Sequence, residues 1–89
     1  MIYIIKRQRH IQPFSSRKLQ ASIYAACLAV RAPSGEAAAT SRRVIQDIKP
    51  WVATKTELTS LDLRHRASHH LRVYNPHAAY AYKYYDTID

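Results

Sequence analysis

The chain begins with two short apolar segments separated by polar residues. Residues 2–5 are a run of β-branched and aromatic side chains, and residues 11–14 form a second run at hairpin distance from the first. This pattern predicts a β-hairpin. Pro13 has no N–H to donate to a sheet, so we expect it at the end or on the open edge of the second strand. The turn Gln8-Arg9-His10 contains no Gly, Asn or Asp, the residues that usually supply a positive φ there.

From Ser15 onward the spacing of apolar residues changes to that of a helix. Ser15 is a typical N-cap, and Phe14 and Leu19 occupy the two positions of a hydrophobic staple. The helix should end near Arg31. Its apolar stripe consists of Leu19, Ile23, Ala26, Cys27 and Val30.

A second helix is predicted after the segment 32–35, which carries Pro, Ser and Gly. Pro50 would clash with the carbonyl of Gln46 and disfavours helical angles at Lys49, so we expect this helix to end or kink there. The apolar positions that follow helical spacing are Ala38, Ser41, Val44, Ile45 and Ile48.

Two more helix starts follow. Thr59 is the predicted cap of a third helix, with Asp62 in the place of the capping-box Glu and residues 55–58 as a short strand ahead of it. Asn75-Pro76 marks the start of a fourth. The predicted buried positions are Leu63, Ala67, His70, Leu71 and Tyr74 on the third helix, and Ala78, Ala81, Tyr82 and Tyr85 on the fourth. We therefore expect an α+β fold, four helices with a small sheet, in a single domain over residues 1–89.

Composition narrows the function. The 89 residues include 14 Lys and Arg against 6 Asp and Glu, a net charge of +8, which points to a phosphate-rich partner. No apolar run approaches the ~20 residues of a membrane span, and we expect a cytoplasmic protein. The single Gly35 rules out a Gly-rich phosphate loop, and no paired carboxylates or Ser-His-acid arrangement indicates catalysis.

Three features admit more than one interpretation. His65 and His69 stand at i, i+4, a spacing that holds zinc, although a solvated role is the commoner one. Cys27 lies on the apolar stripe, which favours a buried, inert thiol. Tyr80 and Tyr84 share a helical face that would be exposed and suited to a protein interface.

The sequence resembles the ATP-cone family in three segments. These are Ile4-Ile5-Lys6-Arg7 followed by Gln12-Pro13-Phe14-Ser15-Ser16-Arg17-Lys18-Leu19, then Thr59-Ser60-Leu61-Asp62-Leu63-Arg64, then Ala78-Ala79-Tyr80. The resemblance implies a four-helix bundle capped by a three-stranded sheet, with ATP or dATP bound beneath the hairpin. It also implies allosteric regulation, through self-association or through docking on a partner such as a ribonucleotide reductase.

The resemblance also suggests which residues contact the nucleotide. Lys6, Arg7 and Lys18 would surround the triphosphate, and the start of the third helix would add hydroxyls and a basic side chain. Mg²⁺ would accompany the triphosphate, held by phosphate oxygens and water more than by carboxylates. The full candidate set is Ile4, Lys6, Arg7, Gln12, Phe14, Ser15, Lys18, Leu19, Thr59, Ser60 and Arg64, with no catalytic residue and no protein-bound metal.

This chain departs from the family pattern at two positions near the hairpin. Gln8-Arg9 replaces the Asp-Gly turn that is typical of the family, and Gln12 stands where an acidic residue is frequent. Two alternatives stay open. The net charge of +8 allows a basic module that binds nucleic acid, and the missing Asp-Gly allows an adaptor that keeps the fold while its nucleotide site has decayed.

Overall fold

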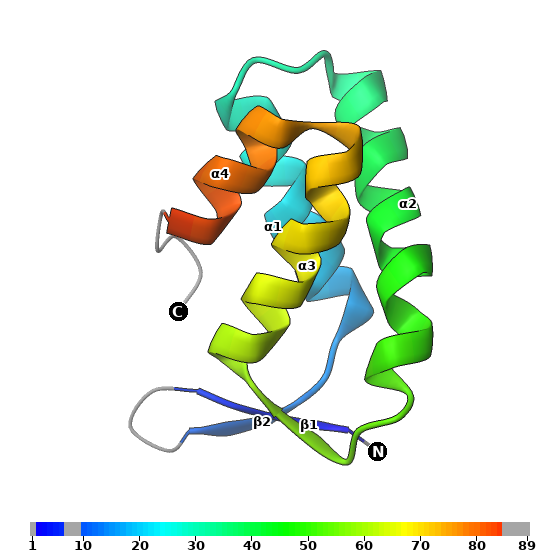
Figure 1. The fold of residues 1–89 in the computed structure, drawn as a ribbon, viewed down its shortest axis with the longest axis vertical. Helices are drawn as coiled ribbons and strands as arrows, with labels where there is room; N and C mark the ends of the chain where they lie inside the picture. Colours follow the sequence, from blue (N-terminus) through cyan, green and yellow to red (C-terminus); the bar gives the residue numbers. More distant parts are fainter. Residues whose placement is uncertain (1, 7–9, 85–89) are drawn as a thin grey trace.

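The computed structural model describes residues 2–6 and 10–84, and within them it contains four helices and a three-stranded mixed sheet (Figure 1). The α+β class and the sheet-capped bundle expected from the sequence are thus confirmed. The elements in chain order are β1 (Tyr3–Ile5), β2 (Ile11–Pro13), α1 (Ser16–Ala29), α2 (Ser34–Val52), β3 (Glu57–Thr59), α3 (Ser60–Tyr74) and α4 (Pro76–Tyr84).

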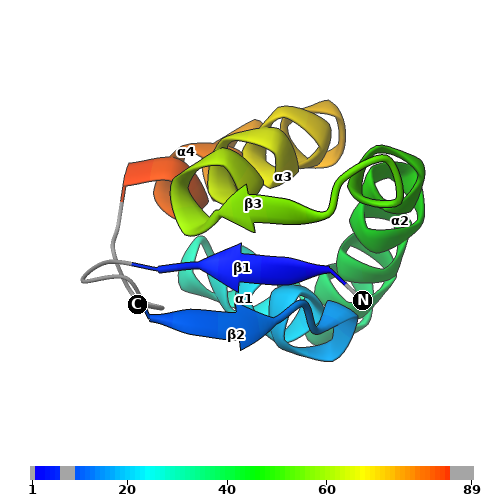
Figure 2. The same ribbon diagram turned by 90° about the horizontal axis from the view of Figure 1, so that it is seen from below.

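The sheet lies across one end of the helices, with β1 between the other two strands (Figure 2). β1 pairs with β2 antiparallel and with β3 parallel, so that Ile4 lies opposite Gln12 on one side and Leu58 on the other. Ile4 and Leu58 are both buried, which fixes the register because a slip of one residue would turn them to solvent. Pro13 ends the edge strand β2, as predicted.

The helices enclose one apolar core. The predicted stripe of α1 is confirmed, since Leu19, Ile23 and Cys27 are buried and Ala26 and Val30 pack partly against them. Burial raises the pKa of the Cys27 thiol, with a smaller contribution from Glu36, which keeps the thiol protonated. The residues that α2 contributes to the buried core are Ala37, Thr40, Ser41, Val44, Ile45, Ile48 and Val52. None of the described helices is long and apolar enough to cross a membrane.

All three predicted helix caps are present. The Ser15 hydroxyl accepts a hydrogen bond from the Lys18 N–H at 3.2 Å, and the Thr59 hydroxyl accepts one from the Asp62 N–H at 3.0 Å. The Asn75 side-chain oxygen accepts the Ala78 N–H at 3.0 Å. Each such cap contributes about 1 kcal/mol, so the starts of α1, α3 and α4 are set locally.

Two details of the helices differ from expectation. The sequence predicts an end or a kink of this helix at Pro50; α2 does not end there but continues to Val52, whose burial offsets the cost of the proline. Ala38 is half-buried, whereas its neighbours Ala37 and Thr40 are buried. The predicted inward-facing Tyr85 and the turn residues Gln8 and Arg9 lie outside the described part of the chain.

The end of α1 is a Schellman motif with an unusual residue in it. The Ala32 N–H donates to the Cys27 carbonyl at 3.0 Å and the Arg31 N–H to the Leu28 carbonyl at 2.9 Å. Arg31 has a φ of 66°, in the left-handed region that favours glycine. The backbone at Arg31 is therefore strained, because residues with a side chain disfavour this conformation.

Replacing Arg31 with glycine should relieve this strain. We expect Arg31→Gly to raise the free energy of unfolding by about 1 kcal/mol, because the left-handed penalty exceeds the extra chain entropy of glycine. Urea denaturation measures the change. The matched control is Arg42→Gly at an exposed position inside α2, which should lower stability by about 1 kcal/mol; a similar loss in both variants would contradict the assignment.

His70 is a second residue whose placement in the helices costs stability. Its Nε2 atom is buried and, among the described residues, has no hydrogen-bond partner. Burial lowers the pKa of His70, with Arg66 acting in the same direction, Asp47 from α2 opposing them, and His69 adding a smaller decrease. Because the folded-state pKa is below the usual 6.5, the unfolded chain takes up this proton more readily.

Stability should therefore fall as the pH falls through about 6.5. The contribution of His70 is fully present above that pH and is lost progressively below it. We expect His70→Gln to reduce the drop in Tm between pH 8 and pH 5.5, measured by circular dichroism. The control is His77→Gln at an exposed position of α4; a His70→Gln profile that runs parallel to the parent's would refute the assignment.

Candidate functional site

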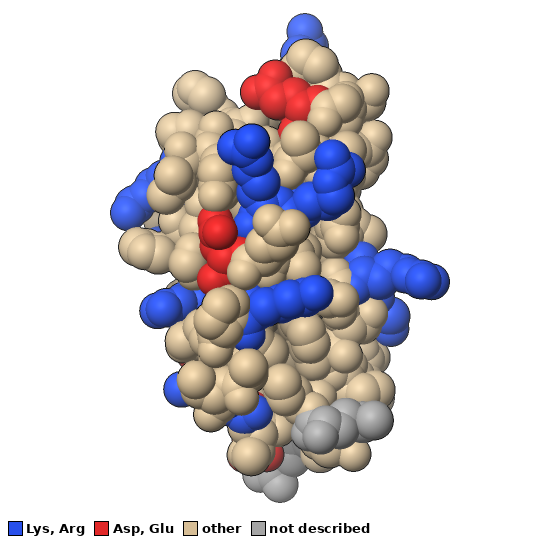
Figure 3. All heavy atoms as spheres, turned by 90° about the vertical axis from the view of Figure 1, so that its right-hand side faces the viewer, with Lys and Arg blue, Asp and Glu red and all other residues tan. Residues whose placement is uncertain are grey.

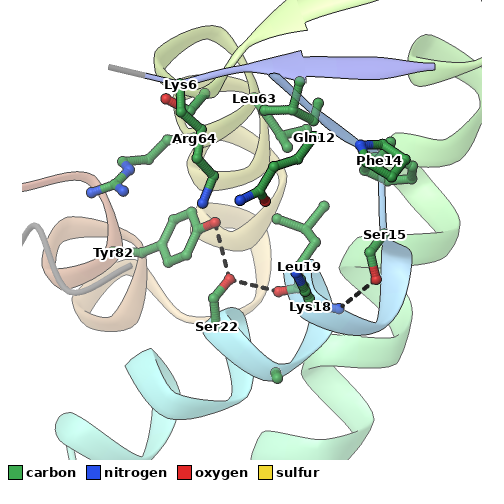
Figure 4. Close-up of a pocket in the computed structure, with 14 residues that line it drawn as sticks. Lys6, Gln12, Phe14, Ser15, Lys18, Leu19, Ser22, Leu63, Arg64 and Tyr82 are labelled. Carbon is green, nitrogen blue, oxygen red and sulfur yellow. Dashed lines mark hydrogen bonds between the residues drawn. The ribbon is translucent and has the colours of Figure 1, made fainter. Parts of the chain in front are cut away.

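A pocket of about 530 Å³ opens between the sheet and the helices (Figure 4). This volume is in the range that holds a small-molecule ligand. Its walls come from the hairpin, from the first turns of α1 and α3, and from α4. The described lining residues are Ile4, Lys6, Gln12, Pro13, Phe14, Ser15, Lys18, Leu19, Ala21, Ser22, Ser60, Leu63, Arg64 and Tyr82.

Three basic side chains from three different elements line this pocket. Lys6 follows β1, Lys18 lies in the first turn of α1, and Arg64 lies in α3. In Figure 4 the Lys6 side chain points into the pocket toward Gln12 and Tyr82, whereas the Arg64 guanidinium points away from Gln12 and lies near the Tyr82 ring. None of the described lining residues is acidic. The pocket is therefore suited to an anion, and its low-dielectric walls strengthen that attraction.

The first turns of α1 and α3 add to this positive potential. Ser15 and Ser60 both line the pocket at helix starts, where unpaired backbone N–H groups and the helix dipole favour negative charge. The Ser15 hydroxyl is already engaged as the acceptor of the Lys18 N–H. Ser60 is half-buried at the first position of α3.

The remaining wall is apolar. Ile4 and Leu19 are buried, and Phe14 and Leu63 are partly buried against the same core. Figure 4 places Phe14 and Tyr82 on opposite sides of the pocket. An apolar wall next to a cationic one matches a ligand that combines a flat ring with phosphate groups.

Most of the described candidate residues meet in this one pocket. Those that line it are Ile4, Lys6, Gln12, Phe14, Ser15, Lys18, Leu19, Ser60 and Arg64. Thr59 is not among the lining residues, and its hydroxyl caps α3. Arg7 lies outside the described part of the chain. The roles of these residues in nucleotide contact stay a prediction.

Sequence reasoning missed a pair of hydroxyl groups in the pocket wall. Ser22 of α1 and Tyr82 of α4 are both buried, and their hydroxyl oxygens are joined by a hydrogen bond of 3.2 Å. The Ser22 hydroxyl donates its proton to the Leu19 carbonyl at 2.7 Å. Helical spacing predicts Tyr82 in the core, and it is buried there, but it also lines the pocket. The position of Ser22 one turn after Lys18 was the available signal.

Pro13, Ala21 and Leu63 also line the pocket without having been proposed as ligand contacts. Pro13 and Leu63 adjoin predicted contacts in sequence, and Ala21 has no side-chain chemistry that a motif search would register. These three residues shape the pocket more than they define its chemistry.

A second, smaller hollow of about 310 Å³ contains the histidine pair. It is lined by Trp51, Asp62, His65, Arg66 and His69. The Arg66 guanidinium lies 5.0 Å from the Trp51 ring centroid, a cation–π contact. Within the described residues no group of three or more His, Cys, Asp or Glu side chains is arranged to hold a metal ion.

Comparisons with known proteins agree with this geometry. A family model described as the ATP cone domain matches residues 2–88, essentially the whole chain. A search of curated proteins finds no match. The matched span includes every strand, every helix and every described residue that lines the larger pocket.

Proposed function

The chain belongs to the ATP cone domain family, whose members are nucleotide-binding regulatory domains and not catalytic ones, and we propose that its ligand is ATP or dATP. The single observation that supports this ligand is the 530 Å³ pocket, in which basic side chains and apolar side chains form adjoining walls. Lys6, Lys18 and Arg64 would contact the phosphates through charge-assisted hydrogen bonds. The base would lie against the apolar side chains near Phe14.

We further propose that α4 transmits the presence of the ligand to a partner or to a second copy of the chain. Tyr82 faces inward and lines the pocket, whereas Tyr80 and Tyr84 are 63% and 60% exposed. Their rings lie 4.6 Å apart between centroids, which makes one exposed aromatic surface. Since tyrosine is enriched at protein interfaces, this surface suits self-association or docking, for instance on a ribonucleotide reductase.

The nucleic-acid alternative draws on the net charge of +8. Figure 3 shows basic side chains scattered over the face that α2 dominates, with acidic side chains among them. On α2 itself, exposed Arg42, Arg43 and Lys49 alternate with Glu36 and Asp47. Charge of both signs weakens the positive potential on this face, so the face is a poorer candidate for binding a polyanion than the pocket is. The decayed-adaptor alternative is tested by the first experiment below.

Nucleotide binding should stabilise the fold. At an ATP or dATP concentration about a hundredfold above Kd, linkage adds about 2.7 kcal/mol, which is roughly 10 °C or more in Tm for a chain of this size. We expect Lys18→Ala to abolish most of this shift. Lys18 is exposed and lies at the positive end of α1, so its loss should not destabilise the free protein.

Differential scanning fluorimetry with and without nucleotide measures both effects. Lys49→Ala is the matched control, because Lys49 is exposed and does not line the pocket. It should keep the full shift. A Tm that ignores ATP, dATP and GTP in the parent chain would refute the nucleotide proposal and favour the decayed adaptor, whereas a mobility shift with DNA or RNA instead would favour the nucleic-acid alternative.

The proposed role of α4 predicts a separation of binding from association. The double change Tyr80→Ala and Tyr84→Ala should leave the nucleotide-induced Tm shift intact and abolish nucleotide-dependent oligomers, measured by light scattering with size exclusion. Val73→Ala is the control, since Val73 is an exposed apolar residue of α3. Oligomers that persist in the double variant would contradict this role for α4.

A further inference from the structure

The described side chains of the pocket do not fit a magnesium ion held by the protein. Mg²⁺ in proteins is usually bound through one or two carboxylates together with substrate phosphates. Among the described residues, those that line the pocket include no Asp or Glu. The side-chain oxygens that line it and could bind a metal ion are the Gln12 amide oxygen and several hydroxyl oxygens. Among these hydroxyls, the ones of Ser15 and Ser22 are already hydrogen-bonded. Positive charge comes instead from side chains.

We propose that this site binds the metal-free polyphosphate of its nucleotide, with Lys6, Lys18 and Arg64 supplying the charge that Mg²⁺ supplies elsewhere. This inference rests on the proposed function and specifies the form of the ligand. Mg²⁺ is then a competitor for the phosphate oxygens and not a cofactor. The affinity is set by the number of phosphates that the three cations meet.

The three cations line the pocket from three different elements of the fold. Lys6 approaches from the sheet, Lys18 from the start of α1, and Arg64 from the second turn of α3 (Figure 4). The two lysines act as mobile point charges, whereas the planar guanidinium can donate two parallel hydrogen bonds to one phosphate. Arg64 lies 5.9 Å from the centroid of the Tyr82 ring, which helps to orient it.

Charge balance sets the direction of the magnesium effect. A nucleoside triphosphate carries roughly four negative charges near neutral pH, and one Mg²⁺ cancels about two of them. Three cations with no described carboxylate among them attract the more highly charged form more strongly. A metal ion would also bring its own positive charge close to the lysines, which is unfavourable. Added Mg²⁺ should therefore weaken binding.

Isothermal titration of the whole chain tests this directly. ATP, ADP and AMP are titrated in EDTA and again in excess Mg²⁺ at matched ionic strength. We expect ATP to bind at least twofold more tightly in EDTA, and each lost phosphate to weaken binding by about tenfold, the value of one charge-assisted hydrogen bond. Inorganic triphosphate in EDTA should displace ATP, because it carries the charges without the base.

A charge variant gives the matched comparison. In Lys18→Gln the remaining cations match a free triphosphate less well, so the preference for the metal-free ligand should shrink or reverse. Lys49→Gln, outside the pocket, should keep the preference of the parent chain.

The outcomes distinguish this inference from the function on which it rests. ATP binding that requires Mg²⁺, or AMP that binds as tightly as ATP, would overturn the metal-free form and leave nucleotide binding intact. Failure of every nucleotide to bind in both buffers would overturn both. Binding in EDTA that Mg²⁺ weakens, with displacement by inorganic triphosphate, would establish it.

Discussion

The pairing of β1 with strands on both of its sides is the constraint on which the rest of the structure depends. Ile4 lies opposite Gln12 in β2 and opposite Leu58 in β3, and burial of Ile4 and Leu58 fixes that register. The parallel pair sets Ile5 opposite Thr59, so the start of α3 at Ser60 lies near Lys6, which follows β1. Segments more than fifty residues apart in sequence thus line one pocket.

That pocket concentrates positive charge in a small fold. Lys6, Lys18 and Arg64 gather with no described acidic residue among them, next to two helix starts of the same polarity. Like charges in one pocket repel one another, which opposes folding of the empty protein. The anionic ligand that we propose would remove that repulsion, and its binding would then stabilise the fold.

α4 is the element through which, in our proposal, ligand binding would reach the surface. It is short, and small alanines seat it against the core, with Ala78, Ala79 and Ala81 buried. Its buried Tyr82 is hydrogen-bonded to Ser22 across the pocket wall, while Tyr80 and Tyr84 face outward. A displacement of Tyr82 would therefore move a helix that is anchored in the core by few large side chains.

Local signals predicted much of this fold, and long-range contacts explain what they missed. Ser15, Thr59 and Asn75 each accept a hydrogen bond from the backbone N–H three residues later, so these caps could be predicted from the sequence. The extension of α2 past Pro50 depends on burial of Val52, a tertiary effect that overrides the local preference. The Ser22–Tyr82 contact spans sixty residues, and no periodic pattern encodes it. The resemblance to a family, more than periodicity, brought Lys6, Lys18 and Arg64 together as one candidate set.

The location of the ligand is the central claim, and backbone NMR tests it most directly. Titration of ¹⁵N-labelled protein with ATP should produce its largest amide shifts at Lys6, Gln12, Lys18, Ser60 and Arg64, which surround the pocket. Shifts concentrated instead around Trp51, His65, Arg66 and His69, in the smaller hollow, would contradict the account.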